Sequence, residues 1–158
     1  PRPVKYAKPM LVIILLLSCF TLAARPYAGI SQSLMSTGLE VGMLNRTFEQ
    51  NLALSLPMRA PSLQAAGIET TMLYRLPHLS PVMAGLGLKA RLGWEQGVGY
   101  ELGAGFALSL SYEFLFSRGI VFVEGSYLPW ITAQGSAIDD VIQDMVRQYI
   151  RFGYRHVF

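Results

Sequence analysis

The chain has 158 residues, of which 52% are hydrophobic, 13 are Lys or Arg, 10 are Asp or Glu and one is Cys. Three of the basic residues lie within the first nine positions, which leaves ten basic residues against ten acidic ones in the remainder. The balance and the lack of a basic cluster argue against nucleic-acid binding, and a single cysteine excludes an internal disulfide framework.

The N-terminus has the layout of a secretory signal peptide. Arg2, Lys5 and Lys8 precede the uncharged segment MLVIILLLSCFTLAA, which ends at Ala24. The apolar run is shorter than the roughly 20 residues that a helix needs to span a bilayer, so an uncleaved anchor is disfavoured. We predict a signal peptide over residues 1–24 with cleavage near Ala24, and one domain over residues 25–158.

Cys19 permits a second interpretation of this segment. The sequence LLSC at 16–19 looks like a degenerate lipoprotein cleavage box, in which Cys19 would be lipidated and would become the mature N-terminus. The apolar stretch continues past Cys19 to a better small-residue site, which favours an ordinary apolar role for the cysteine.

The rest of the chain alternates between apolar residues and polar or small ones, which is the period of β-strands. We predict eight strands, the first of them poorly phased, within residues 26–35, 39–46, 48–58, 65–76, 82–94, 100–113, 119–130 and 148–158. The connections between them are short except for the one from Pro129 to Gln148. The fold class is therefore all-β, an antiparallel barrel whose strands are long enough to cross a membrane.

The clearest strands show one oily row and one row of small or charged residues. In 100–113 the oily row runs from Tyr100 to Tyr112, and an aromatic residue at each end is typical of the interfacial girdles of membrane barrels. A soluble, lipocalin-like barrel would show the same alternation with the faces reversed, so periodicity alone leaves that alternative open.

Charged residues recur on the face opposite the oily one, six acidic and six basic. An eight-stranded barrel has an interior just wide enough for side chains to fill, so we expect these charges to neutralise each other as a lumen plug, with Arg151, Arg155 and Glu101 among the pairs. The predicted lumen set is Glu40, Arg46, Glu49, Glu69, Arg75, Lys89, Arg91, Glu101, Glu113, Glu124, Arg151 and Arg155.

Candidates for catalysis are few. His78 and Ser80 form an H-x-S pair that resembles the one in outer-membrane lipid A deacylases, but here it lies in a proline-flanked turn and no third member of a triad is evident. Neither histidine has a partner at metal-ligand spacing, so we predict no metal site and no cofactor. An enzyme is the less favoured interpretation.

The last long connection contains SAIDDVIQDMVRQ. Ser136 can cap a helix, Asp139 and Asp140 would lie in its first turns, and Ile138, Val141, Ile142 and Met145 recur at helical spacing. We predict a short helix over 136–148 that packs on the barrel rim; a lid or lipid-contacting helix is the alternative.

The C-terminal sequence QYIRFGYRHVF resembles the last strand of bacterial outer-membrane proteins, with Ile150, Phe152, Tyr154 and Phe158 at every second position; His156 departs from the usual hydrophobic residue. Together with the signal peptide and the eight strands, the chain is similar to the small barrels of the OmpA and OmpX type. The resemblance implies an outer-membrane location, termini in the periplasm, and recognition of the last strand by the barrel-assembly machinery.

These features predict an integral outer-membrane barrel, a monomer in contact with outer-membrane lipids and lipopolysaccharide-like lipids, with a structural or surface-interaction role. On this topology the connections near 45–47, 76–81 and 114–119 would be periplasmic, and those near 36–38, 58–62, 95–97 and 129–148 extracellular. The alternatives are a lipid-modifying enzyme and a narrow channel for small or hydrophobic solutes.

Overall fold

The computed structural model of the chain describes residues 24–34, 36–58, 63–76, 80–97, 99–135 and 150–158. Several predictions fall outside the described residues. They are the signal peptide up to residue 23, including Cys19, the site residue His78, and the helix over 136–148. The strands are β1 (Arg25–Ser33), β2 (Ser36–Leu44), β3 (Phe48–Pro57), β4 (Ala65–Leu76), β5 (Val82–Glu95), β6 (Gly99–Glu113), β7 (Gly119–Gly135) and β8 (Ile150–Val157). In these ranges there is no helix long and apolar enough to cross a membrane.

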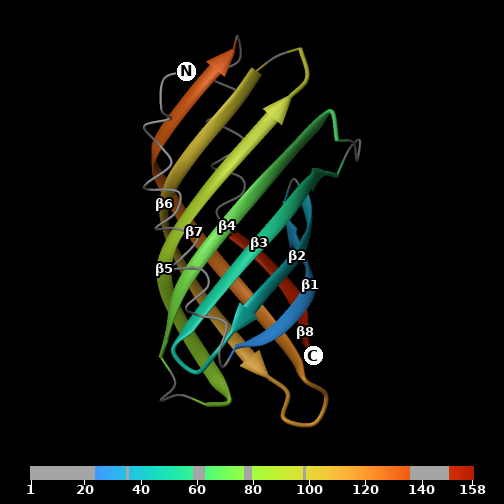
Figure 1. Ribbon diagram of the computed structural model, residues 1–158, viewed down its shortest axis with the longest axis vertical. Coiled ribbons are helices and arrows are strands. Elements are labelled where there is room, and N and C mark those ends of the chain that lie inside the picture. The colour runs from blue at the N-terminus through green and yellow to red at the C-terminus, as the bar shows by residue number, and fades with distance from the viewer. Residues whose placement is uncertain (1–23, 35, 59–62, 77–79, 98, 136–149) are drawn as a thin grey trace, which may run out of the picture.

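The eight strands form one closed antiparallel barrel in sequence order, which confirms the predicted fold (Figure 1). The barrel closes between β1 and β8, where Tyr27 is the register partner of Val157. Beyond that pair, the Phe158 amide donates to the Pro26 carbonyl at 2.9 Å. Closure satisfies the backbone groups that an open sheet edge would leave without partners.

Two predicted boundaries are wrong. The connection expected at 36–38 lies earlier, because Ser36 already begins β2 and its amide donates to the Ser33 hydroxyl at 3.1 Å across the turn. The connection expected to begin at Pro129 begins only after Gly135. Because two residues of β7, Leu128 and Pro129, oppose the single residue Gly105 at a bulge, the strand accommodates a proline in its middle.

The two faces of the wall have opposite polarity. On β6 the outward side chains of Phe106, Leu108 and Leu110 are 45%, 61% and 56% exposed, whereas Ser109 and Ser111, between and beside them, are buried. The apolar rows therefore face outward on the closed barrel and the polar rows face inward. This arrangement contradicts the lipocalin-like alternative, in which the charges would lie on the outside.

The wall is much taller on one side than on the other (Figure 1). β8 and β1 have 8 and 9 residues, whereas β6 and β7 have 15 and 17. β8 pairs with β7 only from Gly119 to Gly125, so the second half of β7 extends past the start of β8. The tall side ends near Gly97, at the opposite end of the barrel from Phe158.

Candidate functional site

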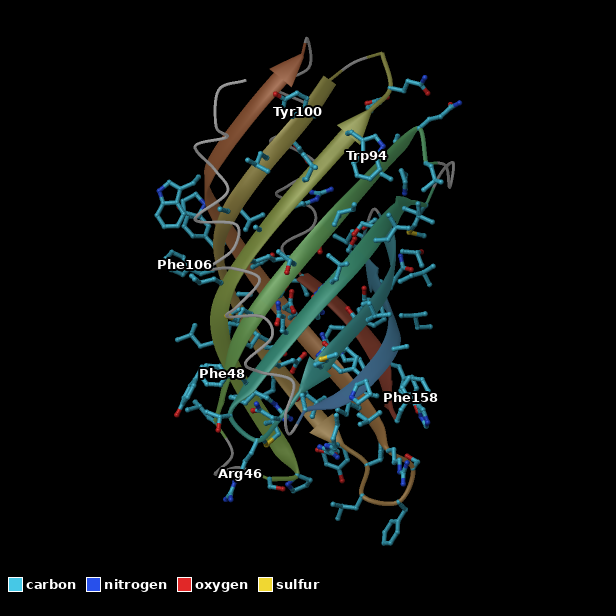
Figure 2. The ribbon with its side chains drawn as sticks, in the orientation of Figure 1. Arg46, Phe48, Trp94, Tyr100, Phe106 and Phe158 are labelled. Atoms are coloured by element: carbon cyan, nitrogen blue, oxygen red, sulfur yellow. The ribbon has the colours of Figure 1, made fainter. Side chains whose placement is uncertain are left out.

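The most distinctive site is the charged lumen (Figure 2). Ten of the described charged residues are buried, each with at most 8% of its surface exposed. Seven strands contribute them, β2 to β8, and five are acidic and five basic, so their formal charges cancel. They are Glu40, Glu49, Glu69, Glu101, Glu124, Arg75, Lys89, Arg91, Arg151 and Arg155.

Glu124 lies at the centre of the larger group. Its carboxylate accepts a hydrogen bond from Lys89 Nζ at 2.7 Å and two from the Arg151 guanidinium, from Nε at 3.0 Å and from Nη2 at 3.1 Å. Two parallel hydrogen bonds between a guanidinium and a carboxylate fix their relative orientation as well as adding energy. Glu124 is 1% exposed, so its charge depends on these two partners rather than on water.

Glu69 extends the group to the neighbouring strands. Its oxygens lie 3.2 Å from both Lys89 Nζ and Arg151 Nη1 and 3.5 Å from Arg91 Nε. Arg91 Nη1 is in turn 3.5 Å from Glu101 Oε1. A side chain on Gly93 would have its Cβ 2.8 Å from that same oxygen, so the missing Cβ makes room for the carboxylate.

A second group surrounds Arg155. Its guanidinium donates to Glu40 and Glu49 and lies over the Phe122 ring, 3.7 Å from the centroid. The Tyr27 hydroxyl also donates to Glu49, at 3.0 Å. Arg151 Nη1, 3.7 Å from Glu40, joins this group to the first. A position over an aromatic face stabilises a desolvated guanidinium in addition to its ion pairs.

An apolar layer lies inside the lumen near the end of the barrel that holds Ala24 and Phe158. Tyr27, Leu44, Ile120 and Val157, from β1, β2, β7 and β8, pack together with at most 2% of each exposed. Past this layer, two Arg25 nitrogens donate to Glu113 Oε1 at 3.1 and 3.2 Å. Since β1 and β6 are not neighbours in the barrel, this ion pair spans the mouth.

Two residues of the predicted lumen set lie elsewhere. Glu113 pairs with Arg25 at the mouth, where the two side chains are 25% and 50% exposed. Arg46 is exposed in the β2–β3 turn, which Asn45 closes by accepting the Thr47 and Phe48 amides (Figure 2). β2 ends at Leu44, so the inward phase of the strand does not reach Arg46.

Sequence reasoning did not single out the aromatic partners of the arginines. Tyr27 and Phe122 both occupy inward positions, and both lie against Arg155. The available signal was an aromatic residue in the inward row of its strand, where small or polar side chains are expected. Asn51, which donates to Glu40 at 3.3 Å, was also not assigned a partner from the sequence.

The remaining predicted site residues are on the outer surface. Ile150, Phe152, Tyr154 and Phe158 of the C-terminal strand are 65%, 59%, 41% and 65% exposed and face outward. Ser80 is exposed in the connection between β4 and β5. In the part of the chain that the structure describes, no three His, Cys, Asp or Glu side chains group together as a metal site would require.

Comparison with known proteins adds little to this description. No protein-family model matches the chain, and no curated protein matches it. Among solved structures, the chain is similar to Neisserial surface protein A, with 15% sequence identity and a TM-score of 0.42 over 85% of this chain and 94% of that one. A match at this level supports no conclusion about function, and the narrower resemblance to the OmpA and OmpX type stays a prediction.

Proposed function

We propose that the protein is an integral outer-membrane β-barrel with a structural or surface-interaction role, whose lumen is plugged by the charged network. The observation that carries the proposal is the polarity of the wall, which has apolar side chains outside and paired charges inside. Soluble monomers rarely expose contiguous apolar patches larger than a few hundred Å², whereas here apolar rows face outward on every strand. Lipid is the solvent that suits such a surface.

The short side of the wall gives the thickness of the membrane band. β8 and β1 are close to the ~9–11 tilted residues that cross a bilayer. We infer that Phe158 and Phe48 mark one boundary and the Phe106–Trp130 ring pair marks the other, with centroids 5.5 Å apart. Figure 2 shows Phe106 between these two residues and Tyr100, which lies near the far end of the tall side.

This placement revises the girdle expected from the sequence. Tyr100 and Tyr112 are separated by twelve positions on β6. At ~3.4 Å per residue and a tilt of ~40°, that separation corresponds to about 31 Å along the barrel axis, more than the ~25 Å of a typical apolar band. We therefore place Tyr100 and Trp94 outside the bilayer, on the part of the tall side that projects from it.

The lumen geometry favours a plug over a channel. Ten buried charges from seven strands lie in the lumen, with the apolar layer of Tyr27, Leu44, Ile120 and Val157 near one end. An ion entering this lumen would have to displace paired charges, and this step opposes conduction. We expect rare or no conductance steps in a planar bilayer.

We further propose that the outward C-terminal row of Ile150, Phe152, Tyr154 and Phe158 is the segment that the barrel-assembly machinery recognises. Outer-membrane lipids, including lipopolysaccharide-like lipids, would then surround the folded monomer. The outward exposure of this row on a strand that closes the barrel is consistent with recognition before closure and lipid contact afterwards.

The deciding experiment is refolding of the chain in detergent micelles and in water, followed by electrophoresis of boiled and unboiled samples. A membrane barrel requires micelles, gives a strand-rich far-ultraviolet circular dichroism spectrum and migrates differently after boiling. A chain that folds in water without detergent and shows no mobility shift would overturn the proposal.

Fluorescence quenching by brominated lipids tests the placement of the membrane band. These lipids should quench the fluorescence of Trp130 in a Trp94→Phe variant more strongly than that of Trp94 in a Trp130→Phe variant.

A further inference from the structure

The turn between β6 and β7 presents three consecutive apolar side chains to the surroundings. Phe114, Leu115 and Phe116 are 42%, 79% and 102% exposed. The turn belongs to the end of the barrel that holds Phe158, and it extends past the point marked C (Figure 1). A run of exposed apolar residues is costly in water and calls for a functional explanation.

This turn has a fixed shape. The Phe114 amide donates to the Gly119 carbonyl at 2.8 Å, and the Val157 amide of β8 donates to the Arg118 carbonyl at 2.9 Å. Arg118 has a φ of 54°, in the left-handed region that a tight turn uses. Since two strands pin the backbone, the apolar side chains are held outward by the fold.

The turn continues the outward row of β6. Leu110, Tyr112, Phe114 and Phe116 follow at every second position, and the Tyr112 and Phe114 rings meet edge to face with centroids 5.1 Å apart. The Phe114 amide bonds to Gly119, and Gly119 is the register partner of His156 on β8. The His156 ring contacts the Phe158 ring, with centroids 5.5 Å apart. The apolar surface therefore runs without a polar break from the proposed membrane band onto the turn.

The charge at this end suits lipid phosphates. Two connections at this end are described in full, 45–47 and 114–118, and they contain Arg46 and Arg118 and no acidic residue. Glu113, the last residue of β6, is paired with Arg25. Aromatic rings beside arginines are the side chains that occupy the boundary between acyl chains and headgroups.

We propose that residues Phe114–Arg118 form a lipid-binding turn. Its apolar side chains insert into the boundary between headgroups and acyl chains, in the leaflet at the end of the barrel that holds Phe158, and Arg118 lies at the phosphates. This inference rests on the proposed membrane location and deepens it. The polar β2–β3 turn, Asn45–Thr47, lies at the same end and provides a natural contrast, because it offers no apolar side chain to the lipid.

Spin labels test the inference directly, since Cys19 is the single cysteine of the chain. Cys19→Ser is combined in turn with Phe116→Cys, Leu115→Cys, Thr47→Cys and, on the outward face of β6, Leu110→Cys. Each nitroxide-labelled full chain is reconstituted in vesicles of phosphatidylcholine and phosphatidylglycerol, and its collisions with oxygen and with a water-soluble nickel chelate are compared.

We expect the oxygen-to-nickel accessibility ratio at 115 and 116 to be several-fold higher than at 47 and to approach that at 110. Ratios at 115 and 116 as low as that at 47, with a high ratio at 110, would overturn the lipid-binding turn while leaving the membrane barrel intact; the apolar turn would then face an aqueous partner. A low ratio at all four positions would instead overturn the membrane location itself.

Discussion

Val123 and Glu124 are neighbours on β7 and lie in opposite surroundings. Val123 faces outward with 52% of its surface exposed, between Leu110 and Phe152 of the adjacent strands. Glu124 faces the lumen with 1% exposed and contacts Lys89 and Arg151. Neighbouring residues of one strand therefore face two different surfaces, an apolar outward one and an inward one in which opposite charges are paired.

The difference shows how so narrow a barrel can contain ten charged residues. Burial of any one of these charges alone would cost too much free energy. The five acidic and five basic side chains are tolerated because their formal charges cancel and they lie close together. On the proposed membrane location the outward surface has no such compensation, because lipid supplies no partner for a charge. Substitutions on the two faces should therefore lower the free energy of unfolding for different reasons and by different amounts.

The largest effect is expected from breaking the balance inside. Glu124→Ala leaves Lys89 and Arg151 without their shared carboxylate, and removing one partner of a buried pair typically costs about 3–5 kcal/mol. Denaturant unfolding in lipid vesicles, followed by tryptophan fluorescence, measures the loss. Glu95→Ala, on an exposed carboxylate at the end of β5, is the control and should change stability by less than about 0.5 kcal/mol. Equal losses in the two variants would mean that the lumen charges are solvated.

A charge on the outward face should cost slightly less. Leu110→Arg places a guanidinium near the middle of the proposed band, where such a substitution costs about 2–4 kcal/mol in a membrane barrel. Phe116→Arg, at the lipid boundary, should cost only about 0–1 kcal/mol. The same unfolding measurement distinguishes them, and a Leu110→Arg variant as stable as the parent would place that side chain in water.

Removing both partners of a lumen pair restores the balance that a single change destroys. Glu124→Ala with Arg151→Ala leaves four acidic and four basic residues, with Lys89 still beside Glu69. We expect the double variant to be more stable than the sum of the two single changes predicts, by about 0.5–3 kcal/mol, the range typical of contacting residues. A four-variant cycle measures this coupling, and strict additivity would show that the two side chains act independently.

The strand pattern made most of this architecture predictable, because a period of two assigns every strand residue to one face. For this reason the sequence alone predicts an inward position for Glu40, Glu69, Lys89 and Glu124, which are buried. The pattern gave no partners, since which strands face each other across a barrel depends on closure and stagger. The prediction for Arg46 was wrong because the alternation does not show where a strand ends. The prediction for Pro129 was wrong because a bulge accommodates the proline and β7 continues beyond it with the alternation shifted by one residue.

The smallest effect is expected at the mouth, where Arg25 and Glu113 pair across the barrel with 50% and 25% of their side chains exposed. Exposed ion pairs contribute about 0–1 kcal/mol, so Arg25→Gln should barely change unfolding. It should also leave the barrel non-conducting, because the ten buried charges and the apolar layer of Tyr27, Leu44, Ile120 and Val157 remain in the lumen. Conductance steps in a planar bilayer for Arg25→Gln, absent from the parent chain, would assign the closure to the ion pair instead of the groups deeper in the lumen. Their absence would show that the buried charges and the apolar layer block the lumen without the ion pair at the mouth.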